Sequence, residues 1–290
     1  MIDYINIDKH DISELPTGVT ISTMCASGKL GTKLYISNIY KYMELNYDNI
    51  ITVKESDEKI RTLRKKKKRK SKKKVDPEKK KKKTNSFFNQ ITVEVRVTEG
   101  GECETFEKQD VINVKLFKNG SIQMSGCKKI ESINIALNKL VDRLKVVKAK
   151  IENKTIVEKK FVENLDKLGV YDFKIDMINS NYAVDMTINR EKLYNILLEK
   201  KIRCRYEPCI HACVTIKYVP KEDNAVEKVI SIFVFEKGSI IITGAKKKSH
   251  IISSYDYVNN IIKENRNDIE KQDLDDIIKN SEFGDLLVSE

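Results

Sequence analysis

The sequence predicts an α+β fold made of two tandem repeats, each an antiparallel sheet with its helices on one face. The first observation is an internal repeat: residues 116–129 read LFKNGSIQMSGCKK and residues 234–247 read VFEKGSIIITGAKK. At one constant offset, Phe117 corresponds to Phe235 and Gly120 to Gly238. The second observation is that an amphipathic helix pattern follows each copy. A shared period of this kind decides the fold before any single element is interpreted.

Each copy is typical of a strand, a tight glycine turn, a second strand, a glycine exit and then a helix. The apolar residues after each copy recur at three-and-four spacing, which places them on one helix face. In the first copy these are Ile130, Ile133, Leu137, Leu140 and Leu144, and in the second they are Ile251, Tyr255, Val258 and Ile262. We therefore expect each helix to lie across a sheet.

The elements before each copy follow the same order in both halves. The first repeat, 19–145, is expected to hold a strand from 19, a short helix at 34–43, and strands at 91–97, 111–117 and 121–126, with a hairpin loop at 99–110. The second repeat, 170–263, is expected to hold a strand from 171, a short helix at 188–198, and strands at 212–219, 229–235 and 239–244. The apolar and polar residues alternate in these strands, which indicates one buried face.

Charge divides the remaining segments. Residues 61–83 hold sixteen Lys or Arg and two acidic residues, a charge of +14 within a net +12, whereas 264–290 carry −6. We expect 1–18 to be an N-terminal segment, about 50–85 a disordered Lys-rich insert, 146–169 a charged helical connector, and 264–290 an acidic tail. The lysine run is interpreted either as a solubilising or localising segment or as a direct nucleic-acid contact.

Several classes of protein do not fit the sequence. The first eighteen residues contain no signal-peptide apolar run, and no stretch has the length of a membrane helix. Without a secretion signal, the six cysteines are expected to be reduced thiols. No nucleophile–base pair, carboxylate constellation or phosphate-binding loop is visible, so we expect neither an enzyme nor a cofactor.

At this point the chain resembles the core domain of the TATA-box-binding protein family. The resemblance is carried in the second repeat by Phe235, Gly238-Ser239-Ile240-Ile241-Ile242-Thr243-Gly244-Ala245-Lys246, Tyr206-Glu207-Pro208 and Phe173-Lys174-Ile175. The first repeat is similar through Phe117, Gly120 and Ser125-Gly126-Cys127-Lys128. The resemblance covers about 19–43 and 87–263 without the insert and the connector. Its divergence is similar to that of relatives in large DNA viruses or protists.

The resemblance implies a saddle: one curved antiparallel sheet, with helices on its convex face and the minor groove of DNA on its concave face. In this family two pairs of phenylalanines wedge between base steps and kink the duplex. Antiparallel pairing places Phe88 beside Phe117, which implies a complete first wedge. The second wedge by the same matching is His211 and Phe235, where histidine is shorter and partly polar.

The resemblance also implies a set of groove-facing, phosphate-contacting and partner-binding residues. The groove-facing positions are Thr23, Cys25, Gln123, Ser125, Met177, Asn179, Ile241 and Thr243. Thr23 and Met177 stand where the family has asparagine. A family arginine that meets phosphate corresponds to Lys217 in the second repeat and to Glu94 in the first. Glu207 corresponds to a family glutamate that contacts a basic loop of a factor IIB-like protein.

Other interpretations of these residues stay open. The phenylalanines are also typical core residues. Zinc is a weaker interpretation of Cys204, Cys209, His211 and Cys213, because their spacing fits no closed four-ligand site and a strand sends alternate residues to opposite faces.

Three functions remain open. The first is a transcription initiation factor that binds the minor groove of AT-rich promoter DNA, bends it, and recruits a factor IIB-like protein and RNA polymerase. The second is a saddle-shaped protein-interaction module with weak or non-specific DNA binding that recruits or sequesters transcription factors. The third is a nucleic-acid enzyme that uses the sheet as a docking domain. The expected location is the nucleus, or a cytoplasmic viral factory or virion if the protein is viral, with no membrane partner.

Overall fold

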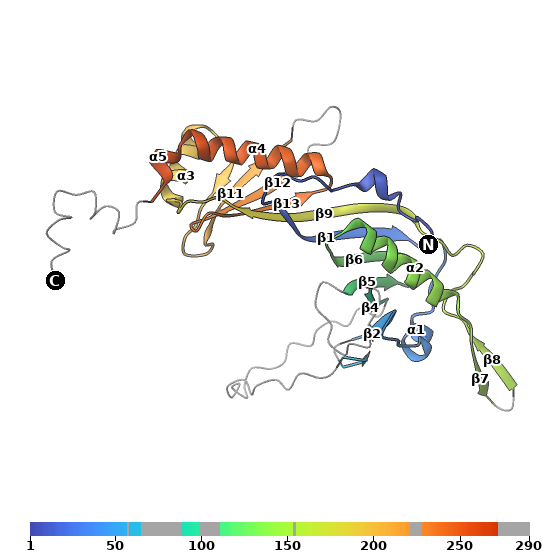
Figure 1. Ribbon diagram of the computed structural model, residues 1–290. Coiled ribbons are helices and arrows are strands. Elements are labelled where there is room, and N and C mark those ends of the chain that lie inside the picture. Colours follow the sequence, from blue (N-terminus) through green and yellow to red (C-terminus); the bar gives the residue numbers. More distant parts are fainter. Residues whose placement is uncertain (57, 65–88, 99–110, 153–154, 221–227, 272–290) are drawn as a thin grey trace, which may run out of the picture. The chain divides into compact units, whose positions relative to one another are not determined.

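The computed structural model describes residues 1–56, 58–64, 89–98, 111–152, 155–220 and 228–271. Their contacts divide the chain into two units. Unit 1 is formed by Met1–Asp11 and Thr23–Asp176, and unit 2 by Ile12–Ser22 and the described residues from Met177 onward. Both units contain antiparallel strands with helices packed on them (Figure 1), so the α+β class is confirmed.

The sheet of unit 1 has the strand order β1-β6-β5-β4-β2-β3. The strands are β1 (Thr20–Lys29), β2 (Ile50–Lys54), β3 (Ile60–Thr62), β4 (Gln90–Arg96), β5 (Val111–Phe117) and β6 (Ser121–Cys127). Two helices, α1 (Ile36–Tyr42) and α2 (Ile130–Lys145), pack on it, α1 against β2 and β4 and α2 against β4 and β6. A short 3-10 helix, η1 (Ile7–His10), lies against α2.

Unit 2 repeats this order as β9-β13-β12-β11-β10. Its strands are β9 (Tyr171–Ala183), β10 (Cys204–Arg205), β11 (Cys213–Tyr218), β12 (Ile230–Phe235) and β13 (Ser239–Ala245). The helix α3 (Arg190–Glu199) packs on β10 and β11, α4 (Lys248–Glu264) packs on β12 and β13, and α5 (Arg266–Ile269) follows. Within the described ranges, no helix combines the length and apolar character needed to cross a bilayer.

Alternation along each strand produces one buried and one open face. In β5, Ile112, Val114 and Leu116 are buried, whereas Asn113, Lys115 and Phe117 are half-buried or exposed. The predicted helix face of the first repeat, from Ile130 to Leu144, is buried at every predicted position. The helices therefore cover the buried face of each sheet. In the described part of the chain, no helix covers the opposite face, which we call the open face.

A glycine at the turn of each repeated hairpin allows the backbone conformation that the turn needs. Gly120 and Gly238 have φ of +87° and +73°, in the left-handed region that glycine adopts at no steric cost. A Cβ at Gly120 would lie 2.2 Å from the carbonyl oxygen of Thr32, and one at Gly238 would lie 2.2 Å from that of Val184. Both turns therefore require glycine, which explains why the repeat preserves it.

In both units, the chain that follows the long helix returns to the start of the short helix. In unit 1 the backbone N–H of Tyr35 donates to the carbonyl of Phe161 at 2.9 Å, and Leu34 forms a β-bridge with Val162. In unit 2 the N–H of Asn189 donates to the carbonyl of Ile269 at 2.6 Å. Phe161 and Ile269 are buried, so each segment closes the core of its own unit.

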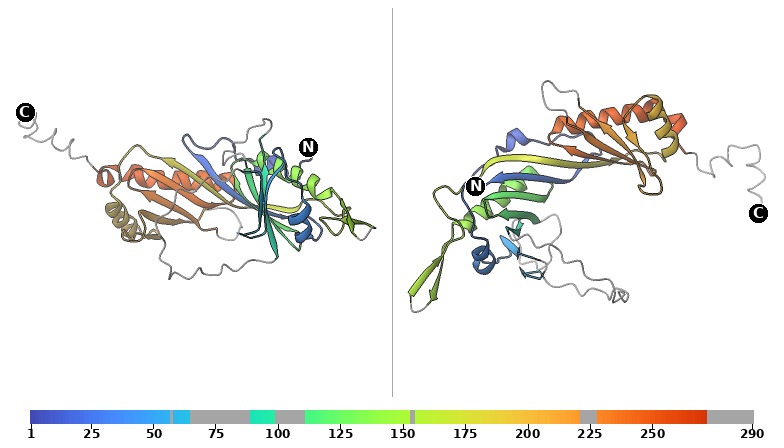
Figure 2. Two further views of the ribbon diagram at one scale, coloured as in Figure 1. Left: turned by 90° about the horizontal axis from the view of Figure 1, so that it is seen from below. Right: turned by 180° about the vertical axis from the view of Figure 1, so that it is seen from behind.

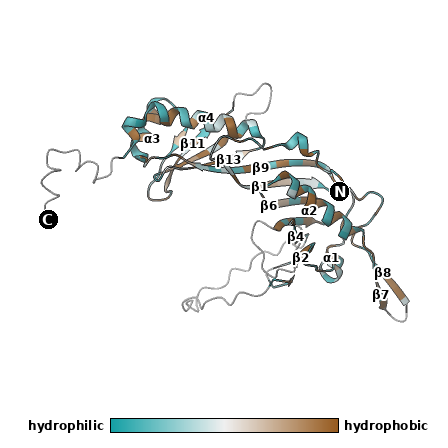
Figure 3. Ribbon diagram, viewed as in Figure 1, coloured by the Kyte–Doolittle hydropathy of each residue, from teal (hydrophilic) through white to brown (hydrophobic). Residues whose placement is uncertain are grey.

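The helical prediction for the connector is wrong. The strands β7 (Lys148–Glu152) and β8 (Thr155–Lys159) pair antiparallel as a β-hairpin, in which Ile151 pairs with Ile156. In β7, lysine alternates with apolar residues from Lys148 to Ile151, and this period of two is typical of a strand. The helical prediction relied on the spacing of the apolar residues later in the connector. The hairpin extends away from the sheet of unit 1 (Figure 2), and its apolar segments are brown in Figure 3.

Two predicted boundaries also need correction. The insert was expected to begin near residue 50, but β2 and β3 lie in its first part, and Ile50, Ile51 and Val53 are fully buried. The acidic tail was expected from 264, but 266–269 form α5 with Ile269 buried. The short apolar runs around Ile51 and Ile269 lie beside highly charged segments, so the sequence pattern did not distinguish them from those segments. Residues 65–88 and 272–290 lie outside the described ranges.

Phe161 provides a test of how strongly the returning segment supports unit 1. Phe161→Ala should reduce the free energy of unfolding by about 3–5 kcal/mol, because a fully buried phenylalanine leaves a cavity. Leu165→Ala in the same segment is the matched control. Leu165 is 37% exposed and should cost less than about 1 kcal/mol. Urea unfolding measures both changes, and equal losses would contradict a core role for Phe161.

Candidate nucleic-acid interface

The open face of unit 1 brings its four predicted groove residues together. Cys25 on β1 pairs with Ser125 on β6, and Gln123 on β6 pairs with Ser27 on β1 and Lys115 on β5. Gln123 is exposed, whereas Cys25 and Ser125 are half-buried. Thr23 lies two residues before Cys25 on the same strand face and is half-buried. The four positions thus share one surface, and that surface is mainly polar.

The open face of unit 2 is more apolar. Thr243 on β13 pairs with Asn179 on β9, and its hydroxyl donates to the Asn179 side-chain oxygen and lies 3.7 Å from the Met177 sulfur. Ile241 pairs with Phe233 on β12, and Phe233 pairs with Thr215 on β11. Phe233 is half-buried on this face and was not among the predicted interface residues. It lies two residues before Phe235 on the same strand, and residues two apart in a strand lie on the same face, so the sequence did indicate it.

The predicted wedge residues lie at the hairpin ends. Phe117 pairs with Gln90, and Phe235 pairs with Cys213, so the two phenylalanines occupy the same position of their units. Both are half-buried, unlike the core residue Phe161. His211 is exposed two residues before Cys213, and its backbone N–H donates to the Glu207 carbonyl at 2.8 Å. Phe88 lies outside the described residues.

An open hollow of about 630 Å³ adjoins Phe117. Its lining is Lys33, Asn89, Phe117, Lys118 and Asn119. Two lysines and two amides therefore surround an aromatic ring at this end of unit 1. Such a combination of positive charge and an apolar ring suits a ligand that carries both phosphates and stacked bases.

The two predicted phosphate positions are occupied differently in the two units. The Lys217 ammonium donates to the Ser231 hydroxyl at 2.7 Å. At the equivalent position of unit 1, the Glu94 carboxylate accepts from Arg64 at 2.9 Å and from the Thr52 hydroxyl at 2.7 Å. Arg64 therefore supplies a positive charge beside Glu94. The sequence pattern places this arginine in the insert, and only the β2–β3–β4 pairing brings it to the open face.

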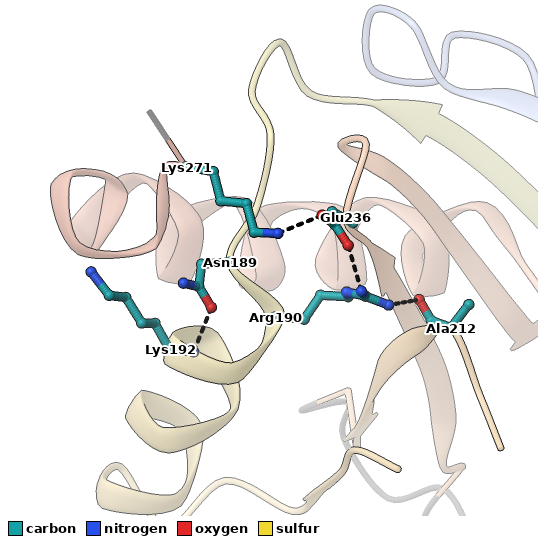
Figure 4. Close-up of polar contacts among 6 residues, drawn as sticks. All are labelled: Asn189, Arg190, Lys192, Ala212, Glu236 and Lys271. Atoms are coloured by element: carbon teal, nitrogen blue, oxygen red, sulfur yellow. Dashed lines mark hydrogen bonds and ion pairs between the residues drawn. The ribbon is translucent and has the colours of Figure 1, made fainter. Parts of the chain in front are cut away.

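A cluster of charges organises the hairpin end of unit 2 (Figure 4). Glu236 accepts from both Arg190 and Lys271, and Arg190 also donates to the Ala212 carbonyl at 2.8 Å. The Arg190 guanidinium lies 5.7 Å from the centre of the Tyr206 ring. The cluster links α3, the β12–β13 turn and the approach to β11. No local sequence pattern indicates this cluster, since Arg190, Glu236 and Lys271 are distant in the chain.

Glu207 lies in the loop between β10 and β11. Its carboxylate accepts from Arg205 at 2.8 Å, and its side chain is 38% exposed. The Glu207 side chain is thus partly accessible to solvent while its carboxylate is bound by Arg205. A charge held in this way can face a basic partner without being free to rotate.

The cysteines offer no metal site in the described part of the chain, where no three His, Cys, Asp or Glu side chains gather suitably. Cys209 is exposed, whereas Cys213 is buried at the sheet. Burial raises the pKa of the Cys127 thiol to about 12, and burial together with nearby Asp176 raises the pKa of Cys25. Cys25 therefore presents a neutral thiol on the open face at neutral pH.

The chain is similar to known proteins of one family. Residues 172–265 match the model of "Transcription factor TFIID (or TATA-binding protein, TBP)". The chain is 38% identical over 257 residues to a "TATA-box-binding protein-like" protein of Acanthamoeba polyphaga mimivirus. That match covers 84% of this chain and 65% of the relative. A solved structure, "Methanococcus jannaschii TBP", is similar at a TM-score of 0.47 and 16% identity, over 85% of this chain and 98% of that one.

The ion pairs of Glu236 should make the folding stability of the protein depend on pH. Lys271 and Arg190 lower the pKa of Glu236, so its folded pKa lies below its unfolded one. The stabilisation is therefore present above the ordinary carboxylate pKa and is lost as pH falls through the lowered pKa. We expect Glu236→Gln to be less stable than the wild type near neutrality, with the difference vanishing in acid. Urea unfolding across this range measures the difference. A gap that persists below the lowered pKa would contradict the electrostatic origin.

Proposed function

Because the chain belongs to the TATA-binding protein family, we propose that it is a transcription initiation factor that binds the minor groove of promoter DNA. Members of this family bind DNA and are not enzymes. In this proposal the open faces of both units lie on the groove, the duplex bends, and the complex recruits a factor IIB-like protein and RNA polymerase. The mimivirus relative favours a viral setting, with action in the nucleus or a viral factory.

The uncovered apolar face of unit 2 is the observation that carries the proposal. Phe233, Phe235 and Ile241 are half-exposed on it, and in the described residues no helix covers this side. An apolar sheet face of this kind is expected to meet a partner. The minor groove suits it, since sugars and base edges offer apolar contact there and a widened groove accommodates a sheet.

Bending tests the function and its asymmetry together. Phe117→Ala should reduce bending more than His211→Ala, because a well-seated aromatic ring must offset the few kcal/mol that unstacking a base step costs. We expect roughly a tenfold loss of affinity for Phe117→Ala and a smaller one for His211→Ala. Fluorescence transfer between dyes at the ends of an AT-rich duplex measures the bend.

The outcomes of this measurement separate the two leading functions. A wild-type protein that binds no duplex, or binds without bending it, would favour the interaction-module alternative. Equal effects of the two substitutions would remove the asymmetry while leaving the function in place. Thermal melting of each variant excludes a loss of folding as the cause.

The lysine-rich segment is proposed to add an electrostatic contribution to DNA binding. Deleting residues 65–83 preserves Arg64 and its ion pair with Glu94 and removes most of the segment's +14 charge. The melting temperature should be nearly unchanged. The salt dependence of DNA binding should become shallower by about 0.9 in log–log slope for each phosphate that the segment neutralises in the full chain. A linker of equal length made of Gly and Ser is the control. A large loss of stability would contradict a detachable role.

Glu207 is proposed to contact the factor IIB-like partner. Glu207→Arg reverses a rim charge and also repels Arg205, so association should slow severalfold at low salt while the dissociation rate changes less. Glu199→Arg, at an exposed glutamate of α3, is the matched control. Stopped-flow measurement of partner binding to the DNA-bound protein distinguishes them. Association of Glu207→Arg at the wild-type rate would place the docking site elsewhere.

A further inference from the structure

The open faces of the two units can be compared position by position. Phe117 opposite Gln90 and Phe235 opposite Cys213 set the alignment, and the antiparallel registers extend it across each sheet. At equivalent positions, unit 1 has Gln123 where unit 2 has Ile241. The same alignment matches other pairs: Lys115 with Phe233, and Asn113 with Ser231. At two of these three positions, unit 1 therefore carries a long polar side chain where unit 2 carries an apolar one, and at the third an amide replaces a hydroxyl.

The polar groups of the two faces also differ in whether they are already paired. In unit 2, the Asn179 side-chain oxygen accepts from Thr243, and the Asn181 oxygen accepts from Ser22 at 2.5 Å. In unit 1, Gln123 is exposed and Asn113 is half-buried, and neither side chain hydrogen-bonds another residue of the described ranges. Unit 1 thus presents amides that can still hydrogen-bond a ligand.

The minor groove gives these amides a specific use. A·T and T·A pairs present only acceptors there, whereas a G·C pair adds the guanine amino group as a donor. A side-chain amide has both an acceptor oxygen and donor hydrogens, so it can pair with either kind of base pair. An apolar side chain leaves the guanine amino group unpaired, which on general grounds weakens binding by about tenfold or more.

We propose that unit 1 accepts G·C base pairs in the minor groove whereas unit 2 is restricted to A·T pairs, with Gln123 as the specificity-determining residue and Asn113, which pairs with Ser125 on the adjacent strand, as a second amide on the same face. The recognised site is then asymmetric in composition, with one half confined to A·T. This inference rests on the proposed minor-groove function and adds to it the base composition of each half-site. The asymmetry also gives the protein a direction on the duplex.

The test begins with selection of bound duplexes from a random pool, followed by replacement of each A·T pair of the selected site by G·C, one at a time. For the wild type, we expect losses within about threefold in one half and of about tenfold or more in the other. Gln123→Ile should make the tolerant half intolerant by about tenfold. Ile241→Gln, at the equivalent position of unit 2, should relax the other half. Melting curves check that both variants fold, and Asn113→Ser is a further variant should Ile241→Gln fail to fold.

Each outcome has a distinct meaning. Half-specific and opposite effects of the two reciprocal substitutions support the inference. Equal intolerance of G·C in both halves, or no change of the profile in Gln123→Ile, overturns it while minor-groove binding stands. If the wild type binds no duplex at all, the proposed function fails, and the inference fails with it.

Discussion

Burial of one face of each antiparallel sheet beneath its helices is the constraint on which the rest of the structure depends. Side chains alternate between faces with a period of two, so a slip of one residue would exchange the buried and open sets. Ile122 and Met124 on β6 must lie under α2, which leaves Gln123 and Ser125 on the open side. The glycine turn at Gly120 holds the hairpin in this register. The composition of the open face therefore follows from packing on the opposite face.

The two units share this arrangement, but the side chains on their open faces differ in charge. Glu94 is held by Arg64 and Thr52, whereas the equivalent Lys217 is held by Ser231. A buried or half-buried charge costs free energy unless it is paired, so each change on the face is accompanied by a local partner. Divergence between the repeats has thus changed the charge at this position of the open face, and in each unit the charged side chain has a hydrogen-bond partner.

The segments that follow the long helices tie the hairpin ends to the core. The carbonyls of Lys118 and Glu236 accept from the N–H groups of Leu34 and Ile188, and the next residues along bond to Phe161 and Ile269. Phe117 and Phe235 precede these carbonyls directly. Their positions therefore depend on returning segments that lie more than thirty residues away in the chain. In unit 2 the Arg190–Glu236–Lys271 cluster adds a second tie at the same place.

The sequence alone determined the two repeats, the main strands and helices of each and the glycine turns, because these depend on local period and on one internal comparison. The groove-facing positions from Thr23 to Thr243 were predicted from the family resemblance. Only the tertiary structure decided the β7–β8 hairpin, the strands β2 and β3, the role of Ile269 and the pairing of Arg64 with Glu94. These features depend on contacts between distant segments. Short apolar runs within highly charged stretches have too weak a local pattern to reveal such contacts, and their burial becomes decisive only when the neighbouring strands and helices are in place.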